Sequence, residues 1–148
     1  MKKLLLMIML SIPATSFAGW TAGYTVLDLD MDDGDSLSLG AINLAYKWDL
    51  DDFSTEAGVL IGVQDDKLYG VSLELEPSVF IKGMYNINEN VFLAATWGKF
   101  EAKASAGSAS ATANDSEAGI GIGFNAGQMT FSFDVMDDTN MFSLQYNF

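Results

Sequence analysis

The last ten residues, Thr139 to Phe148, read TNMFSLQYNF. In an extended chain, one side of this stretch carries Asn140, Phe142, Leu144, Tyr146 and Phe148, and the other carries Met141, Ser143, Gln145 and Asn147. Alternation with a period of two predicts a β-strand with one apolar face and one polar face. A water-soluble protein seldom ends on a strand phenylalanine, because chain termini fray and face water. In a membrane barrel such a residue lies in the aromatic girdle at the lipid boundary, so this strand indicates a barrel.

Segments with similar alternation follow one another along the chain. We expect strands at 20–29, 36–48, 53–63, 70–85, 91–103, 117–126, 129–136 and 139–148. Single-chain bacterial barrels have an even number of strands, and roughly 9–11 tilted residues are enough to span a bilayer. Short connections at 49–52, 86–90 and 126–128 alternate with longer or acidic ones, as a barrel that starts in the periplasm requires. The sequence therefore predicts an all-β fold, an eight-stranded antiparallel up-and-down transmembrane β-barrel.

Two stretches carry a resemblance to a known family. The chain ends in Tyr146-Asn147-Phe148, an aromatic-x-Phe pattern, and Met84–Phe92 joins a tyrosine to a phenylalanine through a short Asn-rich turn. Both resemble the small outer-membrane β-barrel proteins of the OmpA/OmpX-like, porin-like class. The resemblance implies a monomeric outer-membrane protein of a Gram-negative bacterium, in contact with outer-membrane lipid and lipopolysaccharide. It also implies that Tyr146 and Phe148 belong to the signal that the barrel-assembly machinery reads.

The first 18 residues have the three parts of a secretory signal peptide. Lys2 and Lys3 precede an apolar run from Leu4 to Leu10, and Ser16-Phe17-Ala18 forms a small-residue cleavage site. The apolar run is much shorter than the roughly 20 residues that a membrane-spanning helix needs. We therefore expect residues 1–18 to be removed and residues 19–148 to form one outer-membrane β-barrel domain.

Three segments depart from simple alternation. In the second strand the apolar side chains change sides between Ala41 and Ile42, which predicts a β-bulge near Gly40 that inserts one residue. Pro77 lacks a backbone N–H and predicts a bulge or an unpaired site in the fourth strand. The stretch 104–116, ASAGSASATANDS, is low in complexity, small and polar, and we expect it to form the longest and most mobile loop.

Charged and amide side chains fall on the face of the strands opposite the apolar one. We expect the lumen to be filled by a polar network of Glu56, Glu74, Glu76, Lys82, Asp134 and Gln145. The interior of an eight-stranded barrel is just wide enough for side chains to fill it, so the network would act as a plug. Pairs of carboxylates, Glu74 with Glu76 or Glu56 with Asp134, leave acid–base chemistry open as a less favoured alternative.

The composition excludes several classes of function. The chain has no histidine and no cysteine, which excludes histidine-based catalysis, histidine metal sites and a disulfide framework. Without Lys2 and Lys3 the chain keeps five lysines and no arginine against 20 acidic residues, a formal charge of −15 that disfavours binding to nucleic acid. We therefore expect no enzyme activity and no cofactor.

An acidic segment between the first two strands resembles a calcium loop only superficially. An EF-hand needs glycine at its sixth position and a bidentate glutamate at its twelfth, but counting from Asp28 these positions hold Asp33 and Leu39. We expect an acidic loop in water and no defined metal site. A weaker hypothesis is that the outer loops bind divalent cations that bridge lipopolysaccharide phosphates, through Asp32, Asp33, Asp35, Asp65, Asp66, Asp115, Asp137 and Asp138.

Taken together, these patterns favour a non-enzymatic barrel with a structural role or a role in surface interaction through its loops. Two alternatives remain open. One is a secreted, soluble, lipocalin-like barrel that holds a small apolar ligand, although charged residues on the inner face disfavour it. The other is a narrow channel, which would need a wider lumen than eight strands normally leave.

Overall fold

The computed structural model describes residues 19–30, 36–50 and 52–148, and within these ranges all regular elements are β-strands. The strands are β1 (Trp20–Asp30), β2 (Ser36–Leu50), β3 (Phe53–Gln64), β4 (Asp66–Leu68), β5 (Val71–Asn86), β6 (Val91–Ala106), β7 (Ala109–Ala126), β8 (Met129–Met136) and β9 (Thr139–Asn147). Among the described residues, no helix is long and apolar enough to cross a membrane. The predicted leader, residues 1–18, lies outside the described part of the chain.

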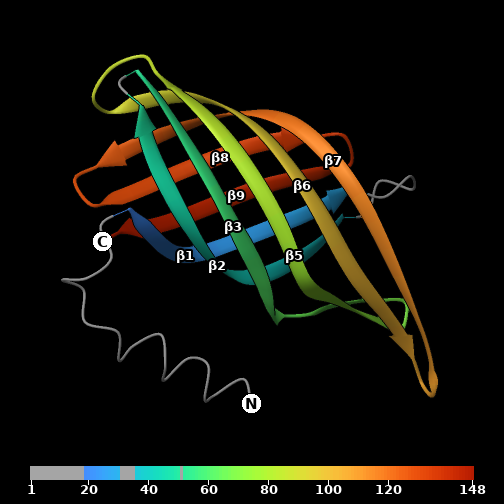
Figure 1. The fold of residues 1–148 in the computed structure, drawn as a ribbon. Helices are drawn as coiled ribbons and strands as arrows, with labels where there is room; N and C mark the ends of the chain where they lie inside the picture. Colours follow the sequence, from blue (N-terminus) through green and yellow to red (C-terminus); the bar gives the residue numbers. More distant parts are fainter. Residues whose placement is uncertain (1–18, 31–35, 51) are drawn as a thin grey trace.

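The eight long strands form a closed antiparallel barrel (Figure 1). Each long strand pairs with the next along the chain, β3 pairs with β5, and β1 closes the ring by pairing with β9. The short strand β4 adds to the free end of β5 through a tight turn at Tyr69-Gly70. The predicted fold class is confirmed.

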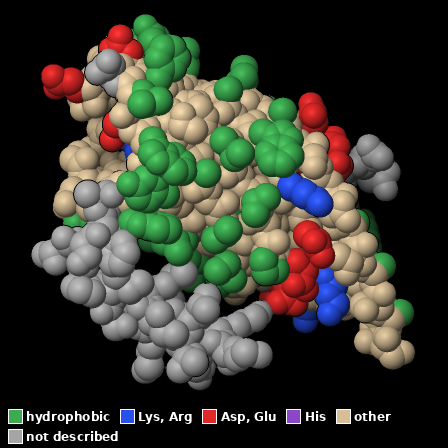
Figure 2. Space-filling model, viewed as in Figure 1, with side chains coloured by type: hydrophobic (Ala, Val, Ile, Leu, Met, Phe, Trp, Pro, Cys, Tyr) green, Lys and Arg blue, Asp and Glu red, His purple; other side chains and the backbone are tan. Residues whose placement is uncertain are grey.

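Side chains alternate between the lumen and the outer wall along the long strands, apart from the bulge in β5 and the exposed start of β7. In β9, Met141, Ser143 and Gln145 are buried, whereas Phe142 and Leu144 between them are exposed. Figure 2 shows hydrophobic side chains spread over the wall, while acidic side chains lie toward both ends of the barrel. The barrel therefore carries apolar groups outside and many polar groups inside, the reverse of a water-soluble barrel.

The interior is filled in three layers. An apolar cluster that includes Leu27, Leu39 and Leu60 occupies the half of the lumen toward the end of β1 at Asp30. Polar side chains fill the middle, and a second small cluster of Met84, Phe92 and Ala94 lies near the turn between β5 and β6. Side chains therefore pack the lumen on both sides of the polar layer.

The irregularity predicted at Pro77 is confirmed, but its effect on the faces was not foreseen. The β5–β6 register shifts between Glu76 and Val79. Ser78 bridges the bulge, because its Oγ donates to the Glu76 carbonyl at 2.9 Å and accepts from the Glu101 N–H at 3.0 Å. The extra residue turns Leu75 into the lumen, where it is buried. The prediction that Glu74 and Glu76 face the lumen is therefore wrong, because both neighbour Leu75 on the strand and lie on its opposite face.

The irregularity at Gly40 lies where it was predicted, but it does not invert β2. The β2–β3 register shifts between Gly40 and Ala41, and the unpaired residue is Val63 on β3. Leu37, Leu39, Ala41, Asn43 and Ala45 are all buried, so β2 alternates without interruption. The apolar side chains change sides because Leu37 and Leu39 pack into the apolar part of the lumen.

The stretch 104–116 is not the long loop that we expected. β6 continues to Ala106, and β7 begins at Ala109 after a two-residue turn at Gly107-Ser108. Gly107 has a positive φ of 61°, which glycine adopts without strain. Both faces of this hairpin carry small side chains, so the sequence lacks the alternation that marks a strand. Pairing between β6 and β7 therefore decides its structure.

The inward glycines of β7 make room for large neighbours, which leads to a first prediction. A Cβ built on Gly123 would lie 1.9 Å from Cζ of Phe92. We expect Gly123→Ala to lower the free energy of unfolding by about 1–3 kcal/mol, as overpacking of a core does. Phe92→Leu in the same chain should recover part of the loss, because the two changes share one space.

Gly83→Ala is the matched control, since the nearest atom to its added Cβ is the Ala95 carbonyl oxygen at 4.0 Å. Urea unfolding, followed by the heat-sensitive gel migration of the folded barrel, measures the three variants and the wild type. Equal stability of the Gly123 and Gly83 variants would contradict the packing described.

Candidate functional site

A buried ion pair lies in the middle of the lumen. Lys82 Nζ on β5 is 2.8 Å from Asp134 Oδ2 on β8, and both side chains are almost completely buried. The same ammonium donates to Ser132 Oγ at 2.9 Å, and Thr96 Oγ1 donates to the other carboxylate oxygen of Asp134 at 2.7 Å. Both oxygens of Asp134 are thus satisfied, as a buried charge requires. Gly121 faces Asp134 in register, and a Cβ there would lie 2.5 Å from Asp134 Oδ1.

A second carboxylate joins the network from β3. Glu56 is the cross-strand neighbour of Lys82 and is 2% exposed. Its Oε1 accepts hydrogen bonds from Thr21 Oγ1 at 3.3 Å and from Gln145 Nε2. The structure thus brings together Glu56, Lys82, Asp134 and Gln145. The network thus contains two buried carboxylates and one ammonium, which contacts Asp134, so Glu56 depends on its hydrogen bonds to Thr21 and Gln145.

Glu74 and Glu76 do not join this network. The bulge at Pro77 places them on the face opposite Leu75, where they lie in register with Lys103 and Glu101 of β6. Neither of the carboxylate pairs considered for acid–base chemistry forms an isolated site: Glu74 and Glu76 lie on the outer face, and Glu56 and Asp134 are both bonded to the side chains described above.

The sequence analysis missed several members of the lumen. Glu117 is 7% exposed and accepts from Thr139 Oγ1 at 2.8 Å and from the Asp138 N–H at 3.3 Å, which anchors the β8–β9 turn. Glu117 has the same parity as Gly119 and Gly121, and this signal could have identified it. Hydroxyl and amide groups that the predicted network did not include also line the lumen: Thr21, Thr25, Asn43, Thr96, Ser132 and Ser143.

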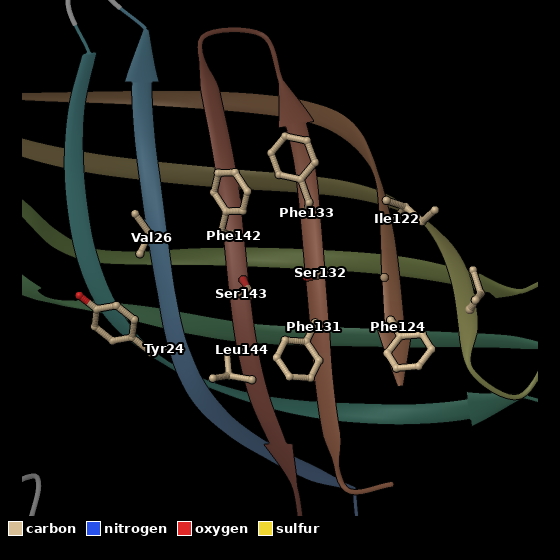
Figure 3. A pocket seen from close by; sticks show the side chains of 12 residues that line it. Tyr24, Val26, Ile122, Phe124, Phe131, Ser132, Phe133, Phe142, Ser143 and Leu144 are labelled. Carbon is tan, nitrogen blue, oxygen red and sulfur yellow. The ribbon is translucent and has the colours of Figure 1, made fainter. Parts of the chain in front are cut away.

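The outer wall carries an apolar furrow across four strands (Figure 3). Its two rims are cross-strand rows of side chains: Val26, Phe142, Phe133 and Ile122 form one, and Tyr24, Leu144, Phe131 and Phe124 form the other. The rings of Phe133 and Phe142 stack with centroids 4.4 Å apart, and the hollow measures about 650 Å³. The furrow belongs to the apolar belt of the wall.

The last residue, Phe148, is held against the first residue of β1. The Phe148 N–H donates to the Trp20 carbonyl at 3.0 Å, and the rings of Tyr146 and Phe148 lie 5.2 Å apart, edge to face. The Tyr146 hydroxyl donates to the side chain of Gln128. These contacts place both aromatics at the rim of the barrel, and their role in assembly stays a prediction.

Three strands continue beyond the others and form what we call the projecting sheet, residues 71–76, 99–106 and 109–116. The β7–β8 pairing stops at Gly119 and Met136, whereas the β6–β7 pairing continues to Ala106 and Ala109. Figure 1 shows this hairpin extending well past the rest of the barrel. Its outward face carries Lys99, Glu101 and Lys103.

One edge of the projecting sheet is open. Among the described residues, no strand pairs with residues 109–118 of β7 on the side that faces β8 farther along the strand. Two-residue turns bound β7 at both ends, and the residues that flank such turns exchange hydrogen bonds. Ala109 therefore bonds to β6 and Ala126 bonds to β8. The backbone N–H and C=O groups of odd residues in β7 thus point toward β6, and those of even residues point toward the β8 side. The Asn125 N–H, which donates toward Asn90 at the β6 side, agrees with this parity.

The acidic outer residues do not form a metal site in the described part of the chain, where no group of three or more carboxylates could hold an ion. Asp32, Asp33 and Asp35 lie outside the described residues. Asp66 accepts from the backbone N–H groups of Ser38 at 3.1 Å and Lys67 at 2.7 Å, and these bonds hold the pKa of its carboxyl below the ordinary value. Asp66 therefore serves to dock β4 against β2.

Comparison with known proteins identifies the fold. No protein-family model and no curated protein sequence matches the chain. Among solved structures, Ail, the attachment invasion locus protein of Yersinia pestis, in complex with the heparin analogue sucrose octasulfate, is 20% identical with a TM-score of 0.56. Ail alone is 18% identical with a TM-score of 0.55, and Neisserial surface protein A is 10% identical with a TM-score of 0.55. Each match covers 87% of this chain and 96% of the other. The chain thus has the fold of small, eight-stranded outer-membrane β-barrels.

The ion pair in the lumen generates a second prediction. Lys82→Met leaves Asp134 buried without its cation, and we expect the free energy of unfolding to fall by about 3–5 kcal/mol. Adding Asp134→Asn should restore part of it, because the uncompensated charge is then gone. The control is Lys103→Met on the outer face. Urea unfolding of the three variants measures the effect, and a Lys82 variant as stable as the Lys103 variant would refute the role of the pair.

Proposed function

We propose that the protein is an integral outer-membrane barrel with a role in surface interaction, formed by residues 19–148 after removal of residues 1–18. The observation that carries this proposal is the polarity of the wall. In β8, the side chains of Phe131 and Val135 are each 47% exposed, whereas Asp134 between them is 0% exposed. Such an arrangement is stable where the outside is lipid, and it opposes a soluble barrel with an apolar ligand inside.

Aromatic side chains set the depth of the barrel in the membrane. Ring pairs lie along the rim where Phe148 meets the start of β1: Trp20 with Tyr46 at 5.4 Å, Tyr46 with Trp48 at 4.8 Å, and Phe53 with Tyr85 at 5.0 Å. Rings of this kind belong to the lipid–water boundary. With this rim at the periplasmic side, the projecting sheet extends outward from the cell.

The filled lumen supports a closed barrel. Leu27 and Leu39 are at most 1% exposed in the outer half, and Lys82 and Asp134 block the middle. No step of transport or catalysis is needed to explain these residues, since the packing and hydrogen bonds account for them. We propose outer-membrane lipid, lipopolysaccharide and the barrel-assembly machinery as partners of a monomeric barrel, the last through Tyr146 and Phe148.

The projecting sheet is the part best placed to contact molecules outside the cell. The outward face of this sheet carries more negative than positive charge, whereas an anionic, heparin-like ligand would require a positive surface. Lys99 and Lys103 on its outward face are outnumbered by Glu74, Glu76 and Glu101. A polyanion would be repelled, so we propose that the sheet contacts neutral or basic partners.

Cysteine labelling tests the proposed topology on a chain that has no natural cysteine. We expect Ser108→Cys, in the β6–β7 turn, to react with a membrane-impermeant maleimide on intact cells. Asn88→Cys, in the turn at the opposite rim, should react only after the outer membrane is opened. Recovery of the protein in the soluble periplasm, or equal labelling of both sites on intact cells, would refute the proposal.

Recording in planar lipid bilayers tests the closed lumen. We expect the purified barrel to insert, as judged by protease protection, without producing unitary current steps. Reproducible current steps of one size would contradict the filled lumen and favour the narrow channel.

A further inference from the structure

We propose that a cavity at the mouth of the lumen, beside the β5–β6 turn, binds a small zwitterion, a molecule with both an ammonium and an anionic group. The cavity measures about 350 Å³, and its polar lining consists of Lys47, Asp52, Asn86, Asn88, Glu89 and Asn125. Sites for small molecules measure roughly 300–1,000 Å³, so the space suits a small ligand. The inference rests on the proposed function only in placing this mouth in the periplasm.

Backbone hydrogen bonds hold the turns around the cavity together at one end of the barrel (Figure 1). The Asn86 N–H donates to the Asp52 carbonyl at 2.9 Å, and the Asn125 N–H donates to the Asn90 carbonyl at 2.6 Å. Lys47, Asn86 and Asn125 each follow by two residues a buried residue of the same strand, so their side chains belong to the inner face. The cavity is therefore the entrance to the lumen.

The entrance ends at the small apolar cluster of the lumen. On the inner face of β5, Met84 lies between Asn86 and Lys82, and it packs with Phe92, which is in register with Asn86. Both side chains are at most 3% exposed. A ligand in the cavity would rest on this cluster and would not reach the buried ion pair.

Asn88 and Asn125 present hydrogen-bond donors to the cavity. Asn88 Oδ1 accepts from the N–H groups of Asn90 and Val91, both at 2.9 Å. Asn125 Oδ1 accepts from Thr130 Oγ1 at 2.9 Å. Because each amide oxygen is already used to hold the local backbone or a neighbouring strand, the amide nitrogen with its two N–H donors is left for a ligand. Such donors favour an anionic group.

Charges of both signs face the same space. Lys47 Nζ is 3.5 Å from Asp49 Oδ1, and because the Asp49 side chain is 74% exposed, water screens this pair and the ammonium stays available. Asp52 and Glu89 contribute carboxylates to the lining. A simple anion would be repelled by these carboxylates, and a simple cation would be repelled by Lys47. A zwitterion satisfies both sets of groups.

A buried hydroxyl beside the entrance has no partner in the fold. Ser54 lies in register with Asp49 on β2 and with Met84 on β5, and it is 1% exposed. Its Oγ has no hydrogen-bond partner among the described residues. Nearly all buried polar groups in native proteins are hydrogen-bonded, so a polar atom from outside the fold is expected here.

Two sources carry the required chemistry: a short peptide with a free amine and carboxylate, and the phosphoethanolamine headgroup of a membrane lipid. The probes are alanyl-alanine and glycerophosphoethanolamine, each titrated by calorimetry against the folded barrel in a nonionic detergent. Binding of the first assigns a peptide, and binding of the second assigns a lipid headgroup. We expect N-acetylation of the bound probe to weaken binding roughly tenfold or more, since it removes the ammonium.

Asn88→Asp and Asn125→Asp test the donors with little change of shape. Each variant keeps the oxygen that accepts the internal hydrogen bonds and replaces the amide nitrogen by a carboxylate oxygen, so a solely structural role would leave binding unchanged. We expect the bound probe to bind both variants roughly tenfold more weakly or worse. Asn90→Asp is the matched control, because it adds the same charge to the same turn at a residue that does not line the cavity. Heat-sensitive gel migration verifies that all three variants are folded.

Three results would overturn the inference: no binding of either probe to wild type, equal binding of the N-acetylated and free probes, or the same loss in Asn90→Asp as in the other two variants. Labelling of Asn88→Cys only after the outer membrane is opened, without binding of either probe, would remove this inference and leave the proposed function standing. Probe binding together with equal labelling of Ser108→Cys and Asn88→Cys on intact cells would refute the topology and leave the binding site standing.

Discussion

The pairing of β1 with β9 is the contact on which the rest of the structure depends. It runs from Thr21–Asn147 to Leu29–Thr139 and turns a sheet into a closed ring. In lipid, each unpaired backbone N–H or C=O costs several kcal/mol, so a sheet with open edges cannot span a bilayer. Once the ring is closed, alternate side chains must face a narrow lumen, and only groups that fill and satisfy that space are tolerated. The three interior layers and the network around Lys82 follow from this constraint.

Closure also explains why one side of the molecule can project. β8 and β9 have 8 and 9 residues, enough for the wall and little more, whereas β6 and β7 have 16 and 18. The additional residues of β6 and β7 extend beyond the wall, where the backbone no longer needs a protein partner for every N–H and C=O group. Beyond it, water can satisfy the backbone of β7, and an open edge costs little. The same strand is thus fully paired in the wall and half-paired above it.

The sequence was sufficient for the fold and for part of the lumen. Alternation in 129–136 and 139–148 defines an apolar and a polar face, and the position of Asp134 and Gln145 follows directly from it. Alternation alone does not show which face is inside when a bulge inverts it. Pro77 marked the place of the irregularity, but only the β5–β6 register shows that Leu75 turns inward and Glu74 outward. The sides of Leu37 and Leu39 could not be read from alternation either, because the half of the lumen into which they pack is itself apolar.

The projecting sheet was missed because the hairpin at 104–116 has small side chains on both faces and shows no period. Spin labels on the outward positions of β7 test the central claim, that this strand passes from lipid into water. In bilayers, labels at 118, 120, 122 and 124 should collide with dissolved oxygen, and labels at 110, 112, 114 and 116 should collide with a water-soluble nickel complex. Access of the nickel complex to all eight positions would contradict the membrane barrel, and oxygen access throughout would contradict the projecting sheet.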